Sequence, residues 1–257
     1  MITLTSDFGL KDSYVAQMKG TILTINPKAT MVDITHDVEK FNVRMGAFIL
    51  ASTASFFPKG TVHLAVVDPS VGTERRAIVI QTKKALFVGP DNGVLMLAAE
   101  KMSIEHTYQL TNPKFRLQKI SNTFHGRDIF APAAAYLDNG VEPSEVGPEI
   151  EEAVEPKFVT VKYKDDIIKG EILHIDGFGN LITNITMQAA SIKEICVNLQ
   201  NQTLTLPFCK TYGQMQAKQS IALVGSHGFL EIAINQGNAA HKFQVKVGDT
   251  VEVGFRT

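Results

Sequence analysis

The pattern of apolar residues changes partway along the chain, and this change limits the possible folds more than any other feature of the sequence. Up to about residue 140, short β-branched runs alternate with longer amphipathic stretches, which is typical of an α/β layer with a mostly parallel sheet. Later runs are short, evenly spaced and β-rich, as in a small barrel or sandwich. We therefore expect an α/β domain over residues 1–156 and an all-β barrel domain over residues 157–257.

The expected elements lie on either side of a boundary segment that contains Pro143, Pro148, Pro156 and several glutamates. Before it, we expect strands at Ile2–Thr5, Met31–Ile34, Val62–Val67, Ala77–Gln81 and Ala85–Val88. The helices expected there are Ser13–Ile25, Arg44–Phe57, Gly93–Lys101 and Ile129–Leu137. After it, the expected strands are Ile167–Ile175, Leu181–Ile185, Ile195–Leu199, Gln202–Leu206, Ser220–Val224, Phe229–Ile234 and Thr250–Phe255.

Charge and composition exclude several classes of function. The chain has 25 basic and 26 acidic residues and no polybasic stretch, so nucleic acid and anionic membranes are poor partners. Its two cysteines have no paired spacing, and no two histidines have zincin-type spacing, so neither a disulfide framework nor a metal site is expected. The first residues reach an acid at Asp7 after a short apolar run, and no apolar stretch is long enough to span a membrane. We expect a soluble, cytoplasmic protein.

Polar residues follow three of the expected strand ends, where ligands collect in α/β sheets. The first such residue is Asp7, which follows the opening strand. Its carboxylate could accept hydrogen bonds from a vicinal diol such as that of ribose. Asp at this position is also a common helix cap, and the residues alone slightly favour the cap.

The second strand end carries Asp68 and, after a turn containing Gly72, Arg75. This arrangement suits a polar pocket, although it could equally be a turn with a solvated salt bridge. The chain contains neither of the glycine-rich phosphate-binding patterns, so nucleotide phosphates are not the expected ligand.

The third cluster surrounds His125, which precedes Gly126 and Asp128 where a helix is expected to begin. Among the seven histidines it has the most functional setting, with structural and catalytic roles about equally favoured. His36, in a polar loop, and His63, within an apolar strand, have weaker cases.

Two glycine-containing segments of the β-rich half could approach a flat base closely. They are IDGFGN at residues 175–180 and GSHGFLE at residues 225–231. Each could equally be an ordinary hairpin turn, and taken alone the turn is favoured.

Taken together, these segments resemble the S-adenosyl-L-methionine (SAM) hydroxide adenosyltransferase family, relatives of the bacterial fluorinase and chlorinase. The resemblance covers essentially the whole chain, through TSDFGLKDSYV, VVDPSVGTERR, VGPDNG, TFHGRDIFAP, IDGFGNLITNI and GSHGFLEIAINQG, in that order. It implies an α/β domain followed by a β-barrel. It also implies a homotrimer whose active sites each lie between one subunit's N-terminal domain and its neighbour's C-terminal domain.

The resemblance also assigns roles to individual residues. It implies that Asp68, Arg75 and His125 handle the nucleophilic water, that Asp7 holds the ribose hydroxyls, and that Phe41 and Phe124 flank the nucleoside. The residues expected from the neighbouring subunit, at the adenine or the methionine end, are Asp176, Asn180 and Ser226, with Phe178, Phe229 and Glu231 close by. Asp12 is a candidate partner for the methionine amine. SAM enters as substrate, adenosine and L-methionine leave as products, and no cofactor is implied.

Departures from the halogenases favour water over halide as the nucleophile. Those enzymes carry Tyr where this chain has Asp68 and His125, and the fluorinase has a halide-binding Ser at the position of Gly126 and a Trp at the position of Phe41. An Asp anion would repel fluoride or chloride. We therefore expect hydrolysis of SAM at C5′, with a halogenase and a nonenzymatic adenosine or SAM sensor as the alternatives.

The chemical difficulty of this reaction is the nucleophile, because methionine leaves readily as a neutral thioether. Making free hydroxide costs roughly 12 kcal/mol at pH 7. In one route, Arg75 stabilises developing hydroxide while His125 and Asp68 orient the water and take its proton. In the other, plain water is positioned in line and loses its proton late. The sequence does not separate these routes.

Overall fold

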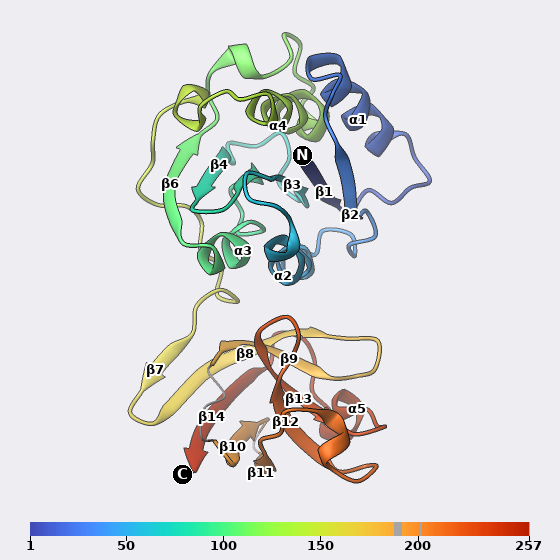
Figure 1. The fold of residues 1–257 in the computed structure, drawn as a ribbon, viewed down its shortest axis with the longest axis vertical. Coiled ribbons are helices and arrows are strands. Elements are labelled where there is room, and N and C mark those ends of the chain that lie inside the picture. Colours follow the sequence, from blue (N-terminus) through green and yellow to red (C-terminus); the bar gives the residue numbers. More distant parts are fainter. Residues whose placement is uncertain (188–191, 201, 257) are drawn as a thin grey trace. The chain divides into compact units, whose positions relative to one another are not determined.

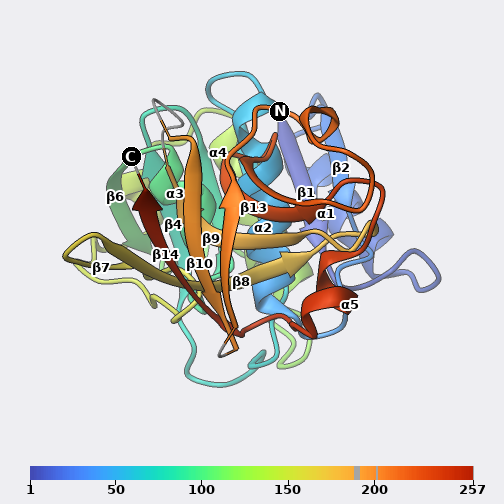
Figure 2. The same ribbon diagram turned by 90° about the horizontal axis from the view of Figure 1, so that it is seen from below.

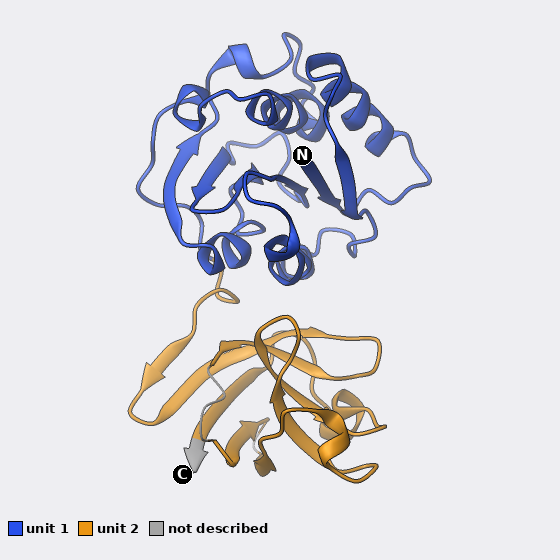
Figure 3. Ribbon diagram, in the orientation of Figure 1, with its two compact units in different colours: residues 1–155 blue, residues 156–257 orange. Residues whose placement is uncertain are grey.

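The chain forms two compact units. The computed structural model describes residues 1–187, 192–200 and 202–256. Unit 1 comprises residues 1–155 and unit 2 residues 156–257 (Figure 3). Among the described residues, no helix is long and apolar enough to cross a bilayer.

Unit 1 is built on a six-stranded mixed sheet of order β2-β1-β3-β5-β4-β6 (Figure 1). The first four strands in this order are parallel, whereas β4 runs antiparallel to both β5 and β6. The strands are β1 (Ile2–Ser6), β2 (Met31–Thr35), β3 (Val62–Val66), β4 (Ala77–Thr82), β5 (Leu86–Pro90) and β6 (Ile104–Gln109). The prediction of an α/β layer with a mostly parallel sheet is confirmed.

Helices cover both faces of this sheet. In Figure 1, α1 (Tyr14–Ile25) and α4 (Ala131–Asp138) lie on one face, and α2 (Val43–Thr53) and α3 (Met96–Lys101) on the other. Every residue of β1 and β3 is buried, as expected for central parallel strands covered on both sides. This burial explains why both strands consist of apolar or β-branched residues except at Ser6 and His63.

Three elements of unit 1 differ from the expected ones. The helix expected to reach Phe57 ends at Thr53 and continues only as a 3₁₀ turn, Ala54–Phe56, before Pro58. Strand β6 was not predicted, because it is an edge strand whose first three residues are exposed and carry little apolar signal. A π-helical turn, Gly126–Phe130, precedes α4, and such turns are frequent at functional sites.

Unit 2 is an antiparallel barrel of order β11-β10-β14-β8-β9-β13-β12, with β7 paired to β8 (Figures 1 and 2). A bridge between Phe208 and Ala222 brings the two end strands, β11 and β12, together and nearly closes the barrel. The strands are β7 (Lys162–Lys164), β8 (Ile167–Ile175), β9 (Leu181–Thr186), β10 (Glu194–Leu199), β11 (Gln202–Pro207), β12 (Ser220–Val224), β13 (Phe229–Ile234) and β14 (Thr250–Arg256). The barrel prediction is confirmed, and the short helix α5 (Ala239–Phe243) is an additional element.

The last residues of unit 1 are fixed to its sheet by a buried carboxylate. Asp91, which follows β5, accepts a hydrogen bond from the Val154 amide at 2.7 Å and another from Arg76 Nε at 2.7 Å. Arg76 also donates to the Glu152 carbonyl. These bonds hold the acidic segment in place immediately before the start of unit 2.

A fully buried histidine in β3 makes the stability of unit 1 sensitive to acid. His63 lies between Phe57 and Phe87, and its Nδ1 is 2.7 Å from Thr3 Oγ1. Burial lowers the pKa of His63 from 6.5 to about 4. The folded state therefore binds fewer protons than the unfolded state below pH 6.5, so stability falls as the pH drops from 6.5 towards 4.

We expect His63→Asn to remove this acid sensitivity. The pKa difference corresponds to a loss of roughly 3 kcal/mol in the wild type by pH 4. The asparagine side chain does not titrate, so the difference in unfolding free energy between pH 7 and pH 4 should shrink by that amount. Urea unfolding at both pH values, followed by circular dichroism, measures this. The exposed His241, changed to Gln, is the control, and an unaltered pH dependence in His63→Asn would contradict the argument.

Candidate active site

The loop after β3 makes a close contact with the segment that precedes His125. Asn92 donates to the Val67 carbonyl at 2.8 Å and fixes the end of the strand. Gly72 has a φ of +80°, and a Cβ on it would lie 2.1 Å from the Asn122 carbonyl oxygen. Only glycine allows this approach of the two loops, which brings residues 68–75 and residue 125 to one place.

Asp68 and Arg75 form a buried, bidentate ion pair within this loop. Arg75 Nε donates to Asp68 Oδ1 at 3.2 Å, and its NH2 nitrogen donates to Oδ2 at 2.5 Å. The Asp68 and Arg75 side chains are 5% and 6% exposed, respectively, and the guanidinium packs over the Phe130 ring. The interpretation of this loop as a turn with a solvated salt bridge is therefore wrong, because the pair is almost fully removed from water.

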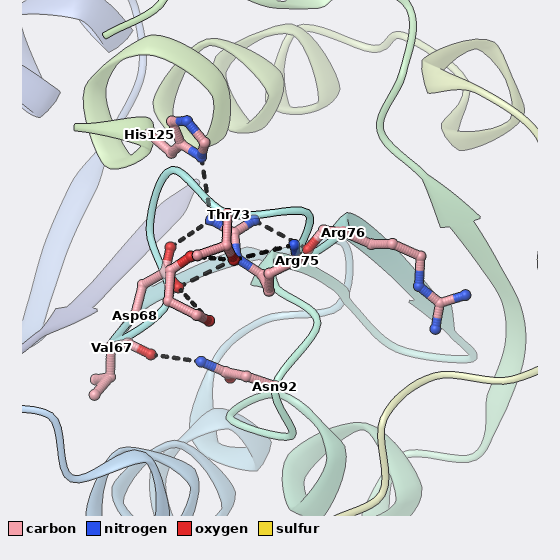
Figure 4. Close-up of polar contacts among 8 residues, drawn as sticks. Val67, Asp68, Thr73, Arg75, Arg76, Asn92 and His125 are labelled. Atoms are coloured by element: carbon pink, nitrogen blue, oxygen red, sulfur yellow. Dashed lines mark hydrogen bonds and ion pairs between the residues drawn. The ribbon is translucent and has the colours of Figure 1, made fainter. Parts of the chain in front are cut away.

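His125 joins this pair through Arg75. The Arg75 NH2 nitrogen lies 3.1 Å from His125 Nδ1, and its NH1 nitrogen donates to the Arg76 carbonyl at 3.0 Å (Figure 4). Burial lowers the pKa of His125, the positive charge of Arg75 lowers it further, and Asp68 and Asp128 act in the opposite direction. The structure thus brings all three residues of the expected water-handling set into one hydrogen-bonded cluster.

The buried carboxylate of Asp128 holds the segment that carries His125 in place. Asp128 is fully buried, and its carboxylate accepts hydrogen bonds from the Ser121 amide at 2.7 Å and from Arg127 Nε at 2.6 Å. Arg127 also donates to Gln17 of α1. His125 therefore stands on a loop anchored at both its ends, which is the support that a precisely placed side chain needs.

Asp7 lies at the same edge of the sheet, because β1 and β3 are paired and end together at Ser6 and Val66. Its Oδ2 atom accepts a hydrogen bond from the Phe41 amide at 2.9 Å, and its carbonyl accepts one from Lys40 Nζ. The interpretation of Asp7 as a helix cap is wrong, since α1 begins at Tyr14 with Ser13 at its N-cap position.

Aromatic side chains stand beside these polar groups. Phe41 is 69% exposed and has a φ of +65°, an uncommon conformation for a bulky residue. Phe124 is buried and packs edge-on against Phe8 and Tyr14. The rings of Phe124, Phe8 and Tyr14, with Arg127, line a pocket of about 340 Å³ together with Gln17, Ser121 and Thr123. Tyr14 and Arg127 were not predicted as site residues. Asp12, which was predicted, lies exposed in the turn before α1.

Unit 2 has its own pocket, of about 420 Å³, at the turn between β8 and β9. Asp176 Oδ1 accepts hydrogen bonds from the amides of Phe178 and Asn180, and its Oδ2 accepts one from Asn180 Nδ2, each at 2.9 Å. The Phe178 ring is 79% exposed. The pocket lining comprises Asp176, Phe178, Asn180, Tyr212, Ile234, Asn235, Gln236 and Gly237, so three of the expected residues gather here.

The remaining expected residues of unit 2 are placed differently. Ser226 lies exposed in the turn between β12 and β13, whereas Phe229 and Glu231 are buried in β13. Glu231 accepts a hydrogen bond from the Tyr212 hydroxyl at 2.6 Å, and its other oxygen is 3.2 Å from His227 Nε2. Tyr212 connects Glu231 to the pocket, and its position in a single 3₁₀ turn, Tyr212–Gln214, gave no sequence signal.

Among the residues that the structure describes, no group of three or more His, Cys, Asp or Glu side chains is arranged to hold a metal ion. His36 and His63 make their contacts with other residues. His36 bonds Ser6 Oγ at 2.7 Å and lies 3.1 Å from Asp33, and His63 is a core residue of β3.

Comparison with known proteins connects both units to one family. Residues 2–147 match the SAM hydroxide adenosyltransferase N-terminal domain, and residues 170–252 match the C-terminal domain. The (R)-S-adenosyl-L-methionine hydrolase of Methanocaldococcus jannaschii is 37% identical over 98% of this chain and 95% of its own length. The hydrolase of the same name from Salinispora arenicola is 36% identical over 98% of this chain and 97% of its own.

One further sequence and one solved structure are also similar to this chain along nearly its whole length. A fluorinase from Actinoplanes sp. is 29% identical over 98% of this chain and 97% of its own length. The crystal structure of an uncharacterized conserved protein from Thermotoga maritima has a TM-score of 0.86 and 38% identity, covering 99% of this chain and 100% of that one. The resemblance found in the motifs is thereby confirmed: the chain belongs to the SAM hydroxide adenosyltransferase family and carries its N-terminal and C-terminal domains in that order.

Proposed function

We propose that this protein hydrolyses SAM by attack of water at C5′, giving adenosine and L-methionine. The observation that carries this proposal is the cluster of Asp68, Arg75 and His125, in which one guanidinium contacts both a carboxylate and an imidazole. Relatives named as SAM hydrolases match along nearly their whole length at 36–37% identity. Composition and charge are consistent with a cytoplasmic location.

The cluster is suited to a neutral nucleophile that attacks a cation. The charges of Asp68 and Arg75 cancel within one ion pair, so the site offers water both hydrogen-bond donors and acceptors without a large net field. The sulfonium group of SAM carries a positive charge that disappears as the C5′–S bond breaks, and methionine leaves as a neutral thioether. No acid is then required for the leaving group, and the protein's task is to place and deprotonate the water.

Binding of the nucleoside is assigned to the edge of the sheet where Asp7 lies. A carboxylate has about four lone-pair positions, and the Asp7 side chain accepts one hydrogen bond from the Phe41 amide. Acceptor positions therefore remain for the two ribose hydroxyls. The exposed Phe41 and the buried Phe124 would flank the nucleoside, and Asp12 would contact the methionine amine.

The other wall of the site is assigned to unit 2 of a neighbouring subunit in a homotrimer. The pocket at Asp176, Phe178 and Asn180 offers an exposed ring for stacking and polar groups for the adenine or the methionine end. Ser226 would contribute from the turn between β12 and β13. Glu231 is only 2% exposed, so we assign it and Phe229 a supporting role, with Glu231 acting through Tyr212.

Halide is expected to replace water poorly. A Cβ on Gly126 would lie 3.2 Å from the Phe124 ring and 3.3 Å from Met18 Sδ, so a side chain at this position is crowded. The Asp68–Arg75 pair has no net positive charge to attract an anion. In high chloride, wild-type protein and SAM should give adenosine and no significant 5′-chloro-5′-deoxyadenosine. Liquid chromatography with mass spectrometry measures both, and a predominantly chlorinated product would instead favour the halogenase.

The proposed function is tested by incubating the purified protein with SAM in ¹⁸O-labelled water. Adenosine labelled at its 5′ oxygen, together with free methionine, is the expected result. Unlabelled adenosine would exclude attack of water at C5′. SAM that binds and stays intact would point to a nonenzymatic sensor.

A further inference from the structure

The hydrogen bond between Arg75 and His125 determines where the proton of the imidazole lies. A guanidinium has five N–H donors and no acceptor, and it stays protonated in proteins. The Arg75 NH2 nitrogen lies 3.1 Å from His125 Nδ1. Nδ1 must therefore accept this hydrogen bond through its lone pair, which leaves no place for a proton on Nδ1.

Arg75 is held in place for this contact, because three of its other four N–H groups also have protein partners. Nε and NH2 bind Asp68, NH1 binds the Arg76 carbonyl, and the second NH2 hydrogen points to His125. Four of the five N–H groups thus have protein partners. The guanidinium is a fixed element of the site, and it fixes the orientation of the imidazole ring in turn.

The surroundings of His125 also favour its neutral form. Burial and the adjacent Arg75 charge lower its pKa, against the opposing influence of Asp68 and Asp128. Protonation on Nδ1 would place an imidazolium against the guanidinium and break the hydrogen bond between them. With Nδ1 unprotonated and the ring neutral, the single ring proton lies on Nε2.

We infer that His125 is a hydrogen-bond donor and not the base: its Nε2–H holds the attacking water, and Asp68 receives the proton. This inference rests on the proposed hydrolysis of SAM and specifies the role of each group. The Nε2–H group donates to one lone pair of the water oxygen and leaves the other free to attack C5′. Asp68 is the carboxylate of the cluster: it accepts two hydrogen bonds from Arg75 and one from Ser70 Oγ at 3.5 Å, and one of its about four acceptor positions remains to take the proton.

A carboxylate is a sufficient base if the proton leaves late. As the C5′–O bond forms, the C5′–S electron pair moves to sulfur, and methionine departs as a thioether. The water oxygen becomes the oxygen of a protonated alcohol, which is strongly acidic and gives its proton to Asp68. The products are adenosine, methionine and a proton that passes from Asp68 to solvent, so atoms and charge balance.

The tautomer can be measured without turnover by nitrogen NMR of protein labelled with ¹⁵N-histidine, with the His125 signals assigned by comparison with His125→Gln. At pH 7 we expect the shift pattern of a neutral imidazole protonated on Nε2, with Nδ1 unprotonated. A ring protonated on Nδ1, or an imidazolium at pH 7, would overturn the inference. Because this readout needs no substrate, it is independent of whether the protein hydrolyses SAM.

A matched pair of variants tests the same inference by activity. The Gln side chain is long enough to place an N–H where His Nε2 stands, whereas Asn reaches only the position of Nδ1. We expect His125→Gln to lower kcat by less than about tenfold and His125→Asn by about 10²-fold or more. If His125 were the base, kcat should fall by about 10²–10⁴-fold in both variants, and that result would overturn the inference. Absence of SAM hydrolysis in the wild type would count against the proposed function instead.

Discussion

Arg75→Ala should lower the turnover of SAM by on the order of 10³-fold, which is among the largest effects of any single substitution in this chain. The guanidinium holds Asp68 through two hydrogen bonds and His125 through a third. Removal of the guanidinium frees both side chains at once. The water then loses the correctly placed donor, His125, and the correctly placed acceptor, Asp68. Because these groups act as a unit, the loss should be in kcat more than in KM.

The same substitution should also destabilise unit 1. Asp68 is 5% exposed, and a buried carboxylate that loses its partner typically costs about 3–5 kcal/mol. Arg75→Lys keeps the positive charge but not the bidentate geometry. We therefore expect it to recover part of the stability and little of the turnover. Steady-state kinetics and urea unfolding of both variants measure the two effects separately.

Arg76→Ala is the matched control. Arg76 follows Arg75 in the sequence, but its side chain points away from the cluster and forms an ion pair with the buried Asp91 (Figure 4). The Arg76→Ala substitution should lower the free energy of unfolding while leaving turnover per folded molecule close to that of the wild type. Near-normal turnover in Arg75→Ala, or equal loss of turnover in both variants, would remove Arg75 from the proposed site.

The elements that could be predicted are those whose burial determines their composition. Strands β1 and β3 are buried at every residue, and β12 and β13 have the bounds that their apolar runs indicated. The edge strand β6 could not be predicted, because three of its six residues are exposed and need not be apolar. The bridge between Phe208 and Ala222 that nearly closes the barrel has no local signal either.

The site shows the same division between local and distant information. Motifs could nominate Asp68, Arg75 and His125, but their contact depends on the close approach of Gly72 to Asn122 from another segment. Distant contacts also decided the role of Asp7, whose carboxylate binds the amide of Phe41 and does not cap α1. Tyr212 could not be nominated, because its importance arises from a hydrogen bond to Glu231, a buried residue of β13.

Mixing two inactive variants should restore activity if each site combines unit 1 of one subunit with unit 2 of its neighbour. Asp68→Ala removes a residue of the cluster in unit 1, and Asp176→Ala removes the acceptor of three hydrogen bonds that shape the pocket of unit 2. Each variant alone should have little activity. In a trimer that contains both variants, one of the three sites combines an intact unit 1 with an intact neighbouring unit 2.

About a third of the wild-type activity should therefore return when the two variants are co-expressed with different tags and purified as mixed trimers. The matched control is Asp68→Ala mixed with His125→Ala. Both lesions then lie in unit 1, every site has a damaged cluster, and no recovery is possible. If the Asp68→Ala and Asp176→Ala mixture also stays inactive although the mixed oligomers form, each site is completed within a single chain. If activity returns in the Asp68→Ala and Asp176→Ala mixture and not in the control mixture, two subunits must contribute to every site.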